Sequence, residues 1–239
     1  YDSARKDAIF ALMNQFAGKV DAKVNILMVP TPAAVLKDKL PANAPVYDAD
    51  AMWESLKAAT PNCGFIDLRE SFAAAADQLY YRTDHHWTNA GAYLAYTAFC
   101  KSDGIEAKPM ETFGVQQVSD SFLGTIYSKT LDGGAQPEAI HAPQELPKLT
   151  VTFDGGKTAD SIYAEEFLAK KDQYAYFFGG NWGRVDIDTG VDNGKSIVII
   201  KDSFANSFVP YLLGEYEHIT MLDLRSQQVC QVLEQLNVE

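Results

Sequence analysis

The sequence predicts an α/β fold of three layers, with helices on both faces of a central, mostly parallel sheet. A chain of 239 residues is long enough for one large domain of this class. Apolar residues recur at helical and strand spacings in alternation near both ends of the chain. The segment 196–200 ends in a continuous apolar run, which is typical of a strand buried on both faces of a parallel sheet.

Helices and short strands alternate through the first part of the chain. Pro30 stops the first expected strand, and Gly104 ends the last helix of this part. Asp48 or Asp50 is expected to cap the second helix. The run 88–99 is apolar nearly all round, so we expect its helix to be buried. The expected elements are a helix over 9–20, a strand over 24–29, a helix over 48–59, a strand over 64–68, a helix over 70–79 and a helix over 88–99.

The segment from about 114 to 171 departs from this rhythm. Its stretches 123–127 and 149–156 alternate apolar and polar residues, which predicts strands, and the stretch between them is rich in loop-forming residues. We interpret the segment as a β-rich insertion or lid beside the main sheet. The whole chain, 1–239, is therefore predicted to form a single domain.

The last third returns to alternating strands and helices. A strand followed at once by a helix places the connecting residues at the carboxyl end of the strand, where open α/β sheets hold their sites. The expected elements are a strand over 174–178, the apolar strand over 196–200, a helix from about Phe204, a strand over 219–222 and a final helix from about Ser226.

Composition excludes several classes of protein. The chain carries 32 acidic and 20 basic residues, a formal charge of −12, so phosphate backbones and anionic lipids would repel it and we expect no nucleic-acid partner. No stretch approaches the roughly 20 apolar residues of a membrane-spanning helix. The first residues do not resemble a signal peptide, and the absence of an initiating Met indicates a processed or trimmed chain.

The three cysteines show no metal-binding or redox motif. Cys63, Cys100 and Cys230 are far apart, and neither a CxxC pair nor a zinc spacing occurs. We expect buried, inert thiols at all three positions, in preference to a metal ligand or a nucleophile.

The strongest local signal is the segment 80–88, Tyr-Tyr-Arg-Thr-Asp-His-His-Trp-Thr. Asp84 and His86 are two residues apart, so in an extended segment their side chains point to the same side. A carboxylate placed in this way accepts from the imidazole Nδ1–H and orients the ring as the base of a nucleophile. One alternative is that Asp84 or Thr88 caps the following helix. Another is a metal site formed by Asp84, His85 and His86.

A second signal lies where the apolar strand ends. Ser203 follows the strand over 196–200, so its hydroxyl falls at the carboxyl end of a strand and near the free N–H groups of a helix N-terminus. The alternative is that Asp202 and Ser203 only cap the helix. Together with Asp84 and His86, Ser203 completes an Asp, His, Ser set in chain order, which favours a hydrolase-type site.

Four sequence blocks follow one another in the chain: TDHHWTNAGAYLAY, FLGTIYSKT, YFFGGN and IIKDSFANSFVPYL. Together they resemble the DHHW family of bacterial proteins, relatives of the alginate O-acetyltransferases within the SGNH (GDSL-like) hydrolase superfamily. The resemblance extends from about Val24 to Arg225. It implies an SGNH-hydrolase-like sandwich with Ser203 as nucleophile, His86 as general base and Asp84 as the partner that orients His86.

The resemblance also bears on the groups around the nucleophile. Where the superfamily has Gly-Asp-Ser, this chain has Lys201-Asp202-Ser203, which puts a long cation in place of a glycine. The DHHW family itself commonly carries this lysine. By resemblance, Gly180 and Asn181 provide donors for an oxyanion, and a plain Gly-Gly-Asn turn is the alternative.

Arg82 and Trp87 flank the two histidines. Arg82 is a candidate for binding a substrate carboxylate, and the alternative is a surface ion pair with Asp67 or Asp77. Trp87, with the two tyrosines of the same segment, is a candidate platform for a sugar ring, and core packing is the alternative.

The resemblance implies an enzyme, an O-acyltransferase or carbohydrate esterase. It would O-acetylate or de-acetylate a sugar of the cell envelope or of an exopolysaccharide through an acyl-Ser203 intermediate. The resemblance places the protein outside the cytoplasm, at the cell surface or envelope, with an acyl donor supplied by a membrane-bound O-acyltransferase. No cofactor and no metal are expected. The alternative is a non-catalytic carbohydrate-binding or polysaccharide-assembly protein on the same fold.

Overall fold

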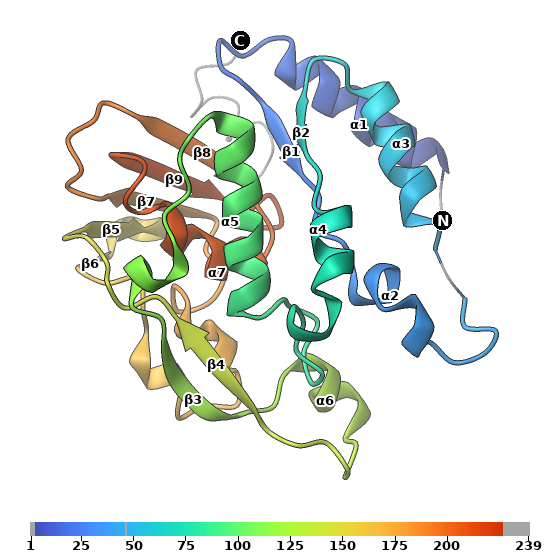
Figure 1. Cartoon of the computed structure of the whole chain (residues 1–239). Helices are drawn as coiled ribbons and strands as arrows, with labels where there is room; N and C mark the ends of the chain where they lie inside the picture. The colour runs from blue at the N-terminus through green and yellow to red at the C-terminus, as the bar shows by residue number, and fades with distance from the viewer. Residues whose placement is uncertain (1–2, 46, 227–239) are drawn as a thin grey trace.

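The chain has a mixed α/β fold (Figure 1). The structure is a computed structural model, and it describes residues 3–45 and 47–226. The helices are α1 (Ser3–Ala17), α2 (Pro32–Val35), α3 (Ala49–Ala59), α4 (Arg69–Ala74), α5 (Asn89–Asp103), α6 (Thr125–Thr130) and α7 (Ala205–Phe208). The strands are β1 (Asn25–Leu27), β2 (Gly64–Ile66), β3 (Gln116–Phe122), β4 (Glu138–Ala142), β5 (Thr150–Phe153), β6 (Thr158–Ala159), β7 (Arg184–Asp188), β8 (Ser196–Ile200) and β9 (His218–Leu222). In this part of the chain no helix has both the length and the apolar character needed to cross a membrane.

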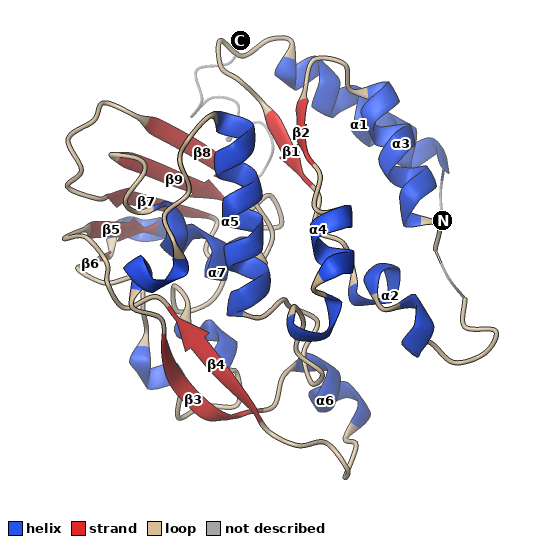
Figure 2. Ribbon diagram, viewed as in Figure 1, coloured by secondary structure: helices blue, strands red, loops and turns tan. Residues whose placement is uncertain are grey.

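The strands form three sheets (Figure 2). β1 and β2 pair in parallel, β3 and β4 pair antiparallel, and the other strands form one sheet in the order β6-β5-β7-β9-β8. In that sheet β8 and β9 run parallel, and every other pair is antiparallel. The prediction of a mostly parallel central sheet is therefore wrong for the described residues. A long crossover lets β8 and β9 run parallel, whereas a short turn makes β5 and β6 antiparallel.

β8 lies at the edge of the five-stranded sheet. Its residues alternate between exposed and half-buried, and Val198 and Ile200 are 43% and 44% exposed. The expected strand is present, but its burial on both faces is not. Within the described residues, β9 is the only strand that pairs with β8.

The helices and strands expected in the first third are present, and Asp48 caps α3 by accepting from the Ala51 N–H at 2.9 Å. Two expected strands are wrong. The stretch 123–127 contains the start of α6. A 3₁₀ turn occupies most of 174–178, and Phe178 has a positive φ of 63°, a conformation that cannot continue a strand. β4 lies in the stretch interpreted as loop. No strand is expected at β7, since its Arg-Val-Asp-Ile-Asp run has only two apolar residues.

The segment from about 114 to 171 contributes to two parts of the fold. β3 and β4 form their own antiparallel pair, which lies below the five-stranded sheet in the view of Figure 1. β5 and β6 instead extend the five-stranded sheet. Part of this β-rich segment is thus built into the main sheet.

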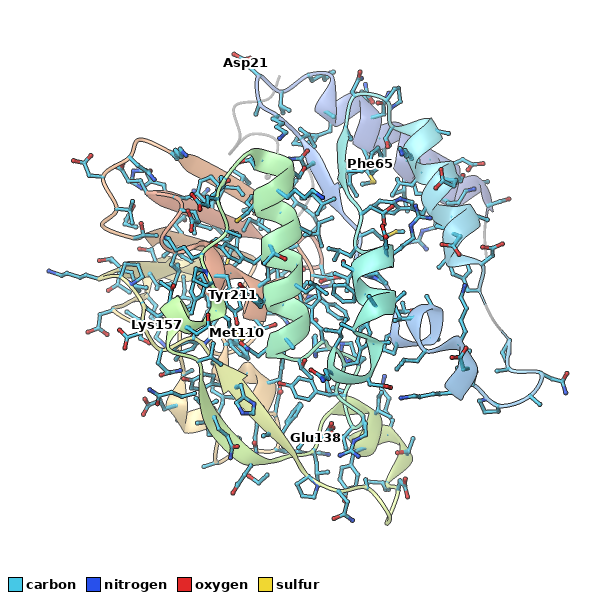
Figure 3. All side chains as sticks on the ribbon, in the orientation of Figure 1. Asp21, Phe65, Met110, Glu138, Lys157 and Tyr211 are labelled. Atoms are coloured by element: carbon cyan, nitrogen blue, oxygen red, sulfur yellow. The ribbon has the colours of Figure 1, made fainter. Side chains whose placement is uncertain are left out.

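α5 is the buried helix at the centre of the molecule, as expected, and it packs against α7, β2 and β4. The side chains of Ala92, Ala95, Tyr96 and Cys100 on this helix are fully buried. Tyr96 stacks with Tyr211, labelled in Figure 3, at 5.6 Å between ring centroids. A second, smaller core joins α1 to α3. The loop that precedes α5 is thereby attached to the buried core.

Two sequence predictions fall on the segment 227–239, outside the described residues. They are Cys230 and the final helix expected from about Ser226. Of the other cysteines, Cys100 is buried and Cys63 is half-buried, and burial raises the pKa of both thiols. A raised pKa keeps the thiol protonated, which agrees with the expected inert role.

Candidate functional site

A tight loop before α5 carries Asp84 and His86. Tyr80 and Trp87 form an antiparallel bridge, and the Tyr81 N–H donates to the His86 carbonyl at 3.2 Å, so the loop doubles back on itself. At its tip Asp84 Oδ1 accepts from the His86 N–H at 2.9 Å and lies 2.5 Å from His86 Nδ1. Both side chains are buried. The loop therefore places a carboxylate directly against an imidazole.

Ser203 lies on the turn that follows β8. Its Oγ is 2.8 Å from His86 Nε2, although the two residues are 117 positions apart in the chain. The Asp202 side chain accepts from the Phe204 N–H at 3.0 Å, so Asp202 caps the turn and the Ser203 hydroxyl contacts the imidazole. The structure thus brings Asp84, His86 and Ser203 together in one line of contacts, as the sequence predicts.

The Asp84 carboxylate is held by donors from two segments. Besides its contacts with His86, its Oδ2 accepts from the Thr125 N–H at 2.7 Å and from the Thr125 hydroxyl at 3.0 Å. Burial raises the pKa of this carboxyl, but the hydrogen bonds from His86 and Thr125 outweigh burial and hold its pKa well below the usual value. Asp84 is therefore ionised at neutral pH. Thr88 occupies the N-cap position of α5, but its hydroxyl donates to the Gln78 carbonyl at 2.7 Å and makes no capping hydrogen bond. Asp84 does not cap α5, since it binds its own loop and α6.

Gly124 gives the FLGTIYSKT block a physical role that sequence reasoning missed. A Cβ at this position would lie 2.2 Å from Asp84 Cβ, far inside contact distance. The Gly124 N–H donates to Thr83 Oγ1 at 3.2 Å, and the Thr83 hydroxyl donates to Glu138 at 2.7 Å. Glu138 is labelled in Figure 3. Glycine lets α6 approach closely enough for Thr125 to reach the Asp84 carboxylate.

We expect Gly124→Ala to destabilise the protein by about 1–3 kcal/mol, the usual effect of forcing a methyl group into a packed site. The new Cβ would push α6 away from Asp84 and weaken the hydrogen bonds of Thr125. Urea unfolding followed by circular dichroism measures the loss. Gly133→Ala is the matched control, because a Cβ at Gly133 meets nothing within 4 Å. Equal stability of the two variants would contradict the prediction.

Aromatic side chains cover the His86 ring. Tyr174 stacks on it at 3.9 Å between centroids with 9° between planes, and Phe204 lies at 5.1 Å. The Ser207 hydroxyl contacts the Tyr174 hydroxyl at 2.9 Å and accepts from Trp87 Nε1 at 2.8 Å. Trp87 is only 2% exposed, so the predicted sugar platform is wrong for this residue and its core-packing alternative holds. Sequence reasoning also missed Tyr174, which it placed in a strand.

Arg82 and His85 are the exposed residues of the loop. The Arg82 side chain is 78% exposed, and its Nε lies 3.6 Å from Glu138 Oε1, so its ion-pair partner is neither of the two aspartates expected from the sequence. His86 contacts Ser203, whereas His85 contacts Thr125, with 2.6 Å between His85 Nδ1 and Thr125 Oγ1. Both side chains are therefore accessible from solvent at the edge of the site.

Gly180 and Asn181 lie in a turn whose residues 178–180 all have positive φ, of 63°, 70° and 109°. Asn181 Oδ1 accepts from Lys201 Nζ at 3.1 Å and from Asn206 Nδ2 at 3.2 Å. These contacts bind the Gly-Gly-Asn turn to the segment that follows β8. Lys201 and Asn206 had no role in the sequence-based prediction, because nothing in the local pattern indicates a contact over 20 positions or more.

Among the described residues, one cluster has ligand atoms close enough to bind a metal ion. The atoms of Asp84, His85 and His86 lie within 4.8 Å of one another. Both ring nitrogens of His86 already make contacts, one with Asp84 and one with Ser203. The Nδ1 of His85 contacts Thr125. A metal ion bound by all three residues would have to replace some of these contacts, so the cluster is not a preformed metal site.

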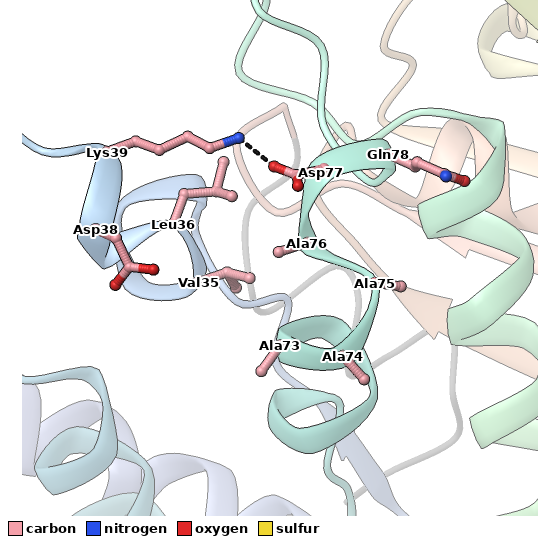
Figure 4. Close-up of a pocket in the computed structure, with 10 residues that line it drawn as sticks. All are labelled: Val35, Leu36, Asp38, Lys39, Ala73, Ala74, Ala75, Ala76, Asp77 and Gln78. Atoms are coloured by element: carbon pink, nitrogen blue, oxygen red, sulfur yellow. Dashed lines mark hydrogen bonds and ion pairs between the residues drawn. The ribbon is translucent and has the colours of Figure 1, made fainter.

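A surface pocket of about 570 Å³ lies elsewhere, between residues 35–39 and 73–78 (Figure 4). Its lining is mainly alanine and aliphatic side chains, and Lys39 and Asp77 form an ion pair across it. Neither a histidine nor a serine lines this pocket. The line of contacts that ends at Ser203 is therefore the better candidate for chemistry.

The fold and the site define a mixed α/β protein in which a buried carboxylate, an imidazole and a serine hydroxyl follow one another in contact. The chain belongs to the DHHW family. The family model described as "DHHW protein" matches residues 3–222, which is nearly the whole chain. This result confirms the resemblance carried by the four sequence blocks.

Two solved structures are similar over almost all of the chain. A DHHW family protein from Eubacterium siraeum matches with a TM-score of 0.79 at 26% identity, over 98% of this chain and 81% of that chain. PatB1 from Bacillus cereus, in a structure with a sulfonyl adduct, matches with a TM-score of 0.78 at 22% identity, over 98% of this chain and 84% of that chain. No match was found among curated protein sequences. The comparisons show a shared fold.

Proposed function

We propose that this protein is a serine-dependent O-acyltransferase or esterase, built on an SGNH-hydrolase-like sandwich. The observation that carries the proposal is the line of contacts from Asp84 through His86 to Ser203. It joins an ionised carboxylate, an imidazole and a hydroxyl, the set that activates serine on several unrelated folds. Membership of the DHHW family supports the proposal through the family's relation to the alginate O-acetyltransferases.

In the proposed mechanism, His86 Nε2 takes the proton of Ser203 as Oγ attacks the carbonyl carbon of an acyl donor. The tetrahedral intermediate then collapses, the bond to the leaving oxygen breaks, and the proton on Nε2 passes to that oxygen. An acyl-Ser203 ester remains. A sugar hydroxyl, or water, gives its proton to Nε2 and attacks this ester. The bond from the acyl carbon to Oγ then breaks and the proton on Nε2 passes to Oγ, which restores the Ser203 hydroxyl and releases the acylated sugar or, with water, the free acid. Asp84 accepts from the Nδ1–H throughout and stabilises the imidazolium.

The proposed substrate is a sugar of the cell envelope or of an exopolysaccharide, with the protein located outside the cytoplasm. Family resemblance supports both points, and it supports a membrane-bound O-acyltransferase as the source of the acyl group. The exposed guanidinium of Arg82 is proposed to bind a substrate carboxylate, which its geometry suits. Gly180 and Asn181 are proposed to donate to the oxyanion. The reaction needs no cofactor, because serine and imidazole supply the nucleophile and the base.

Two other functions compete with this proposal. One is a carbohydrate-binding or polysaccharide-assembly protein on the same fold, in which Ser203 is idle. The other is a metal-dependent hydrolase that uses Asp84, His85 and His86, whose ligand atoms are clustered. Reactivity of the Ser203 hydroxyl separates the three functions, because only the acyl-serine mechanism requires an activated serine.

We expect a sulfonyl fluoride to label Ser203 of the folded protein with one sulfonyl group per chain. An activated Oγ attacks the sulfur and displaces fluoride, and the PatB1 structure with a sulfonyl adduct motivates this choice of probe. Intact-mass spectrometry counts the adducts and peptide mapping locates them. A chelator is expected to leave the labelling unchanged.

Ser203→Ala and His86→Ala are the controls for this experiment. The first variant removes the labelled hydroxyl and the second removes its base, so both are expected to show only background labelling. Folded wild-type protein that stays unlabelled at Ser203 at every pH between about 6 and 9 would exclude the enzyme proposal. Ester hydrolysis that disappears with the chelator, in protein that stays unlabelled at Ser203, would favour the metal-dependent alternative.

A further inference from the structure

Lys201 is a buried cation next to the proposed nucleophile. Its side chain is only 2% exposed. Its Nζ donates to Asn206 Oδ1 at 2.8 Å and to Asn181 Oδ1 at 3.1 Å, and it lies 3.6 Å from Asp223 Oδ2. A buried ammonium needs such partners, because loss of water disfavours its charge. Burial accordingly lowers the pKa of Lys201, and the nearby Asp223 only partly opposes this.

The contacts of Lys201 determine how the Asn181 carboxamide is turned. The Asp223 carboxylate is already engaged, because it accepts from Arg225 at 2.6 Å. The shortest contacts of the Lys201 ammonium are instead those with the carboxamide oxygens of Asn206 and Asn181. An ammonium only donates, so Asn181 must turn its oxygen toward Nζ. Asn206 Nδ2 donates to the same oxygen at 3.2 Å, which imposes this orientation from a second side.

The NH2 group of Asn181 is therefore available to a ligand. Asn181 is exposed, and its Nδ2 donates to no other described residue. Both groups that hold its oxygen belong to the segment that carries Ser203. Lys201 precedes Ser203 by two positions, and Asn206 follows it by three and donates its N–H to the Ser203 carbonyl at 3.2 Å. The free amide donors are thus tied to the turn of the nucleophile.

We propose that Lys201 is a positioning residue whose ammonium holds the Asn181 carboxamide so that its NH2 group donates to the oxyanion formed at Ser203. The inference rests on the proposed function and deepens it. Without Lys201, only Asn206 Nδ2 holds the Asn181 oxygen, so the amide turns over more readily and presents its oxygen to the developing negative charge. A donor that is already oriented stabilises that charge better, because nothing has to reorganise during the reaction.

Lys201→Met tests the inference, because methionine has a similar length and no charge. We expect kcat for the hydrolysis of p-nitrophenyl acetate to fall about 10²- to 10³-fold, the usual loss for one oxyanion donor. KM is expected to change much less, since the contact forms in the transition state. Lys195→Met is the matched control. It removes the same charge from an exposed lysine just before β8, and it is expected to keep the wild-type kcat.

Asn181→Ala provides a second variant that is expected to fold, because this side chain is exposed. Its kcat is expected to fall as far as that of Lys201→Met. The double variant is expected to be no slower than Asn181→Ala alone, since both changes remove one interaction. Thermal unfolding followed by circular dichroism checks that each variant folds. If Lys201→Met does not fold, the kcat of Asn181→Ala is the measurement that tests the inference.

The outcomes distinguish the inference from the proposed function. A wild-type kcat in Lys201→Met or in Asn181→Ala would overturn the inference, as would losses that multiply in the double variant. In each of these cases, sulfonyl labelling of Ser203 and ester turnover by the wild-type protein would still support the proposed function. Wild-type protein that shows neither labelling nor turnover would overturn both.

Discussion

Ser203→Ala and His86→Ala are each expected to reduce the turnover of an ester by about 10⁴- to 10⁶-fold. The first variant removes the attacking oxygen and the second removes the base that lies 2.8 Å from it. Measurement of kcat/KM with p-nitrophenyl acetate gives both losses. The double variant is expected to be hardly slower than either single variant, because the two side chains act as one unit.

His141→Ala is a suitable control, because this histidine is exposed on β4 and away from the line of contacts. It is expected to keep wild-type turnover. Circular dichroism should show that Ser203→Ala and His86→Ala remain folded. Losses that multiply in the double variant would contradict a shared role in one mechanism, even with the fold intact.

The pairing of Asp84 with His86 could be predicted from the sequence because it is local. Only two residues separate the side chains, and a tight loop holds them on the same side. Their contact with Ser203 spans 117 positions, and no periodicity in the chain determines such a distance. The Asp, His, Ser set in chain order indicated the grouping, and resemblance to the DHHW family, read from the order of the four blocks, assigned Ser203 as the nucleophile.

The missed features depend on contacts between distant segments. The sequence around Gly124 alternates like a strand. In the structure α6 begins there and approaches Asp84 so closely that only glycine fits at position 124. Trp87 is a residue type that often stacks on sugar rings. Its place in the core becomes clear only from the buried hydrogen bond of its Nε1 to the distant Ser207. Strand direction likewise follows from the connections between strands, which apolar runs such as 196–200 do not reveal.

Asp84→Asn is expected to lower kcat about 10³- to 10⁴-fold and to leave a measurable residual activity. The asparagine NH2 group would donate to His86 Nδ1, which traps the ring with its proton on Nε2. That tautomer cannot accept the proton of Ser203. The base is still present in this variant, so we expect the residual rate to exceed that of His86→Ala. An activity within about tenfold of the wild type would show that Asp84 does not orient the ring.

The same variant tests how Asp84 contributes to stability. Its pKa is depressed in the folded protein by the hydrogen bonds from His86 and Thr125, which outweigh burial. A carboxyl with a depressed pKa stabilises the fold above the unfolded-state pKa of about 3.9, and this stabilisation is lost as the pH falls toward the folded-state value. We therefore expect the free energy of unfolding of the wild type to exceed that of Asp84→Asn near pH 6, and the difference to shrink below about pH 4. Urea unfolding of both proteins from about pH 6 down to about pH 2 measures the difference. A difference that stays constant as the pH falls would mean that Asp84 contributes through packing and not through its charge.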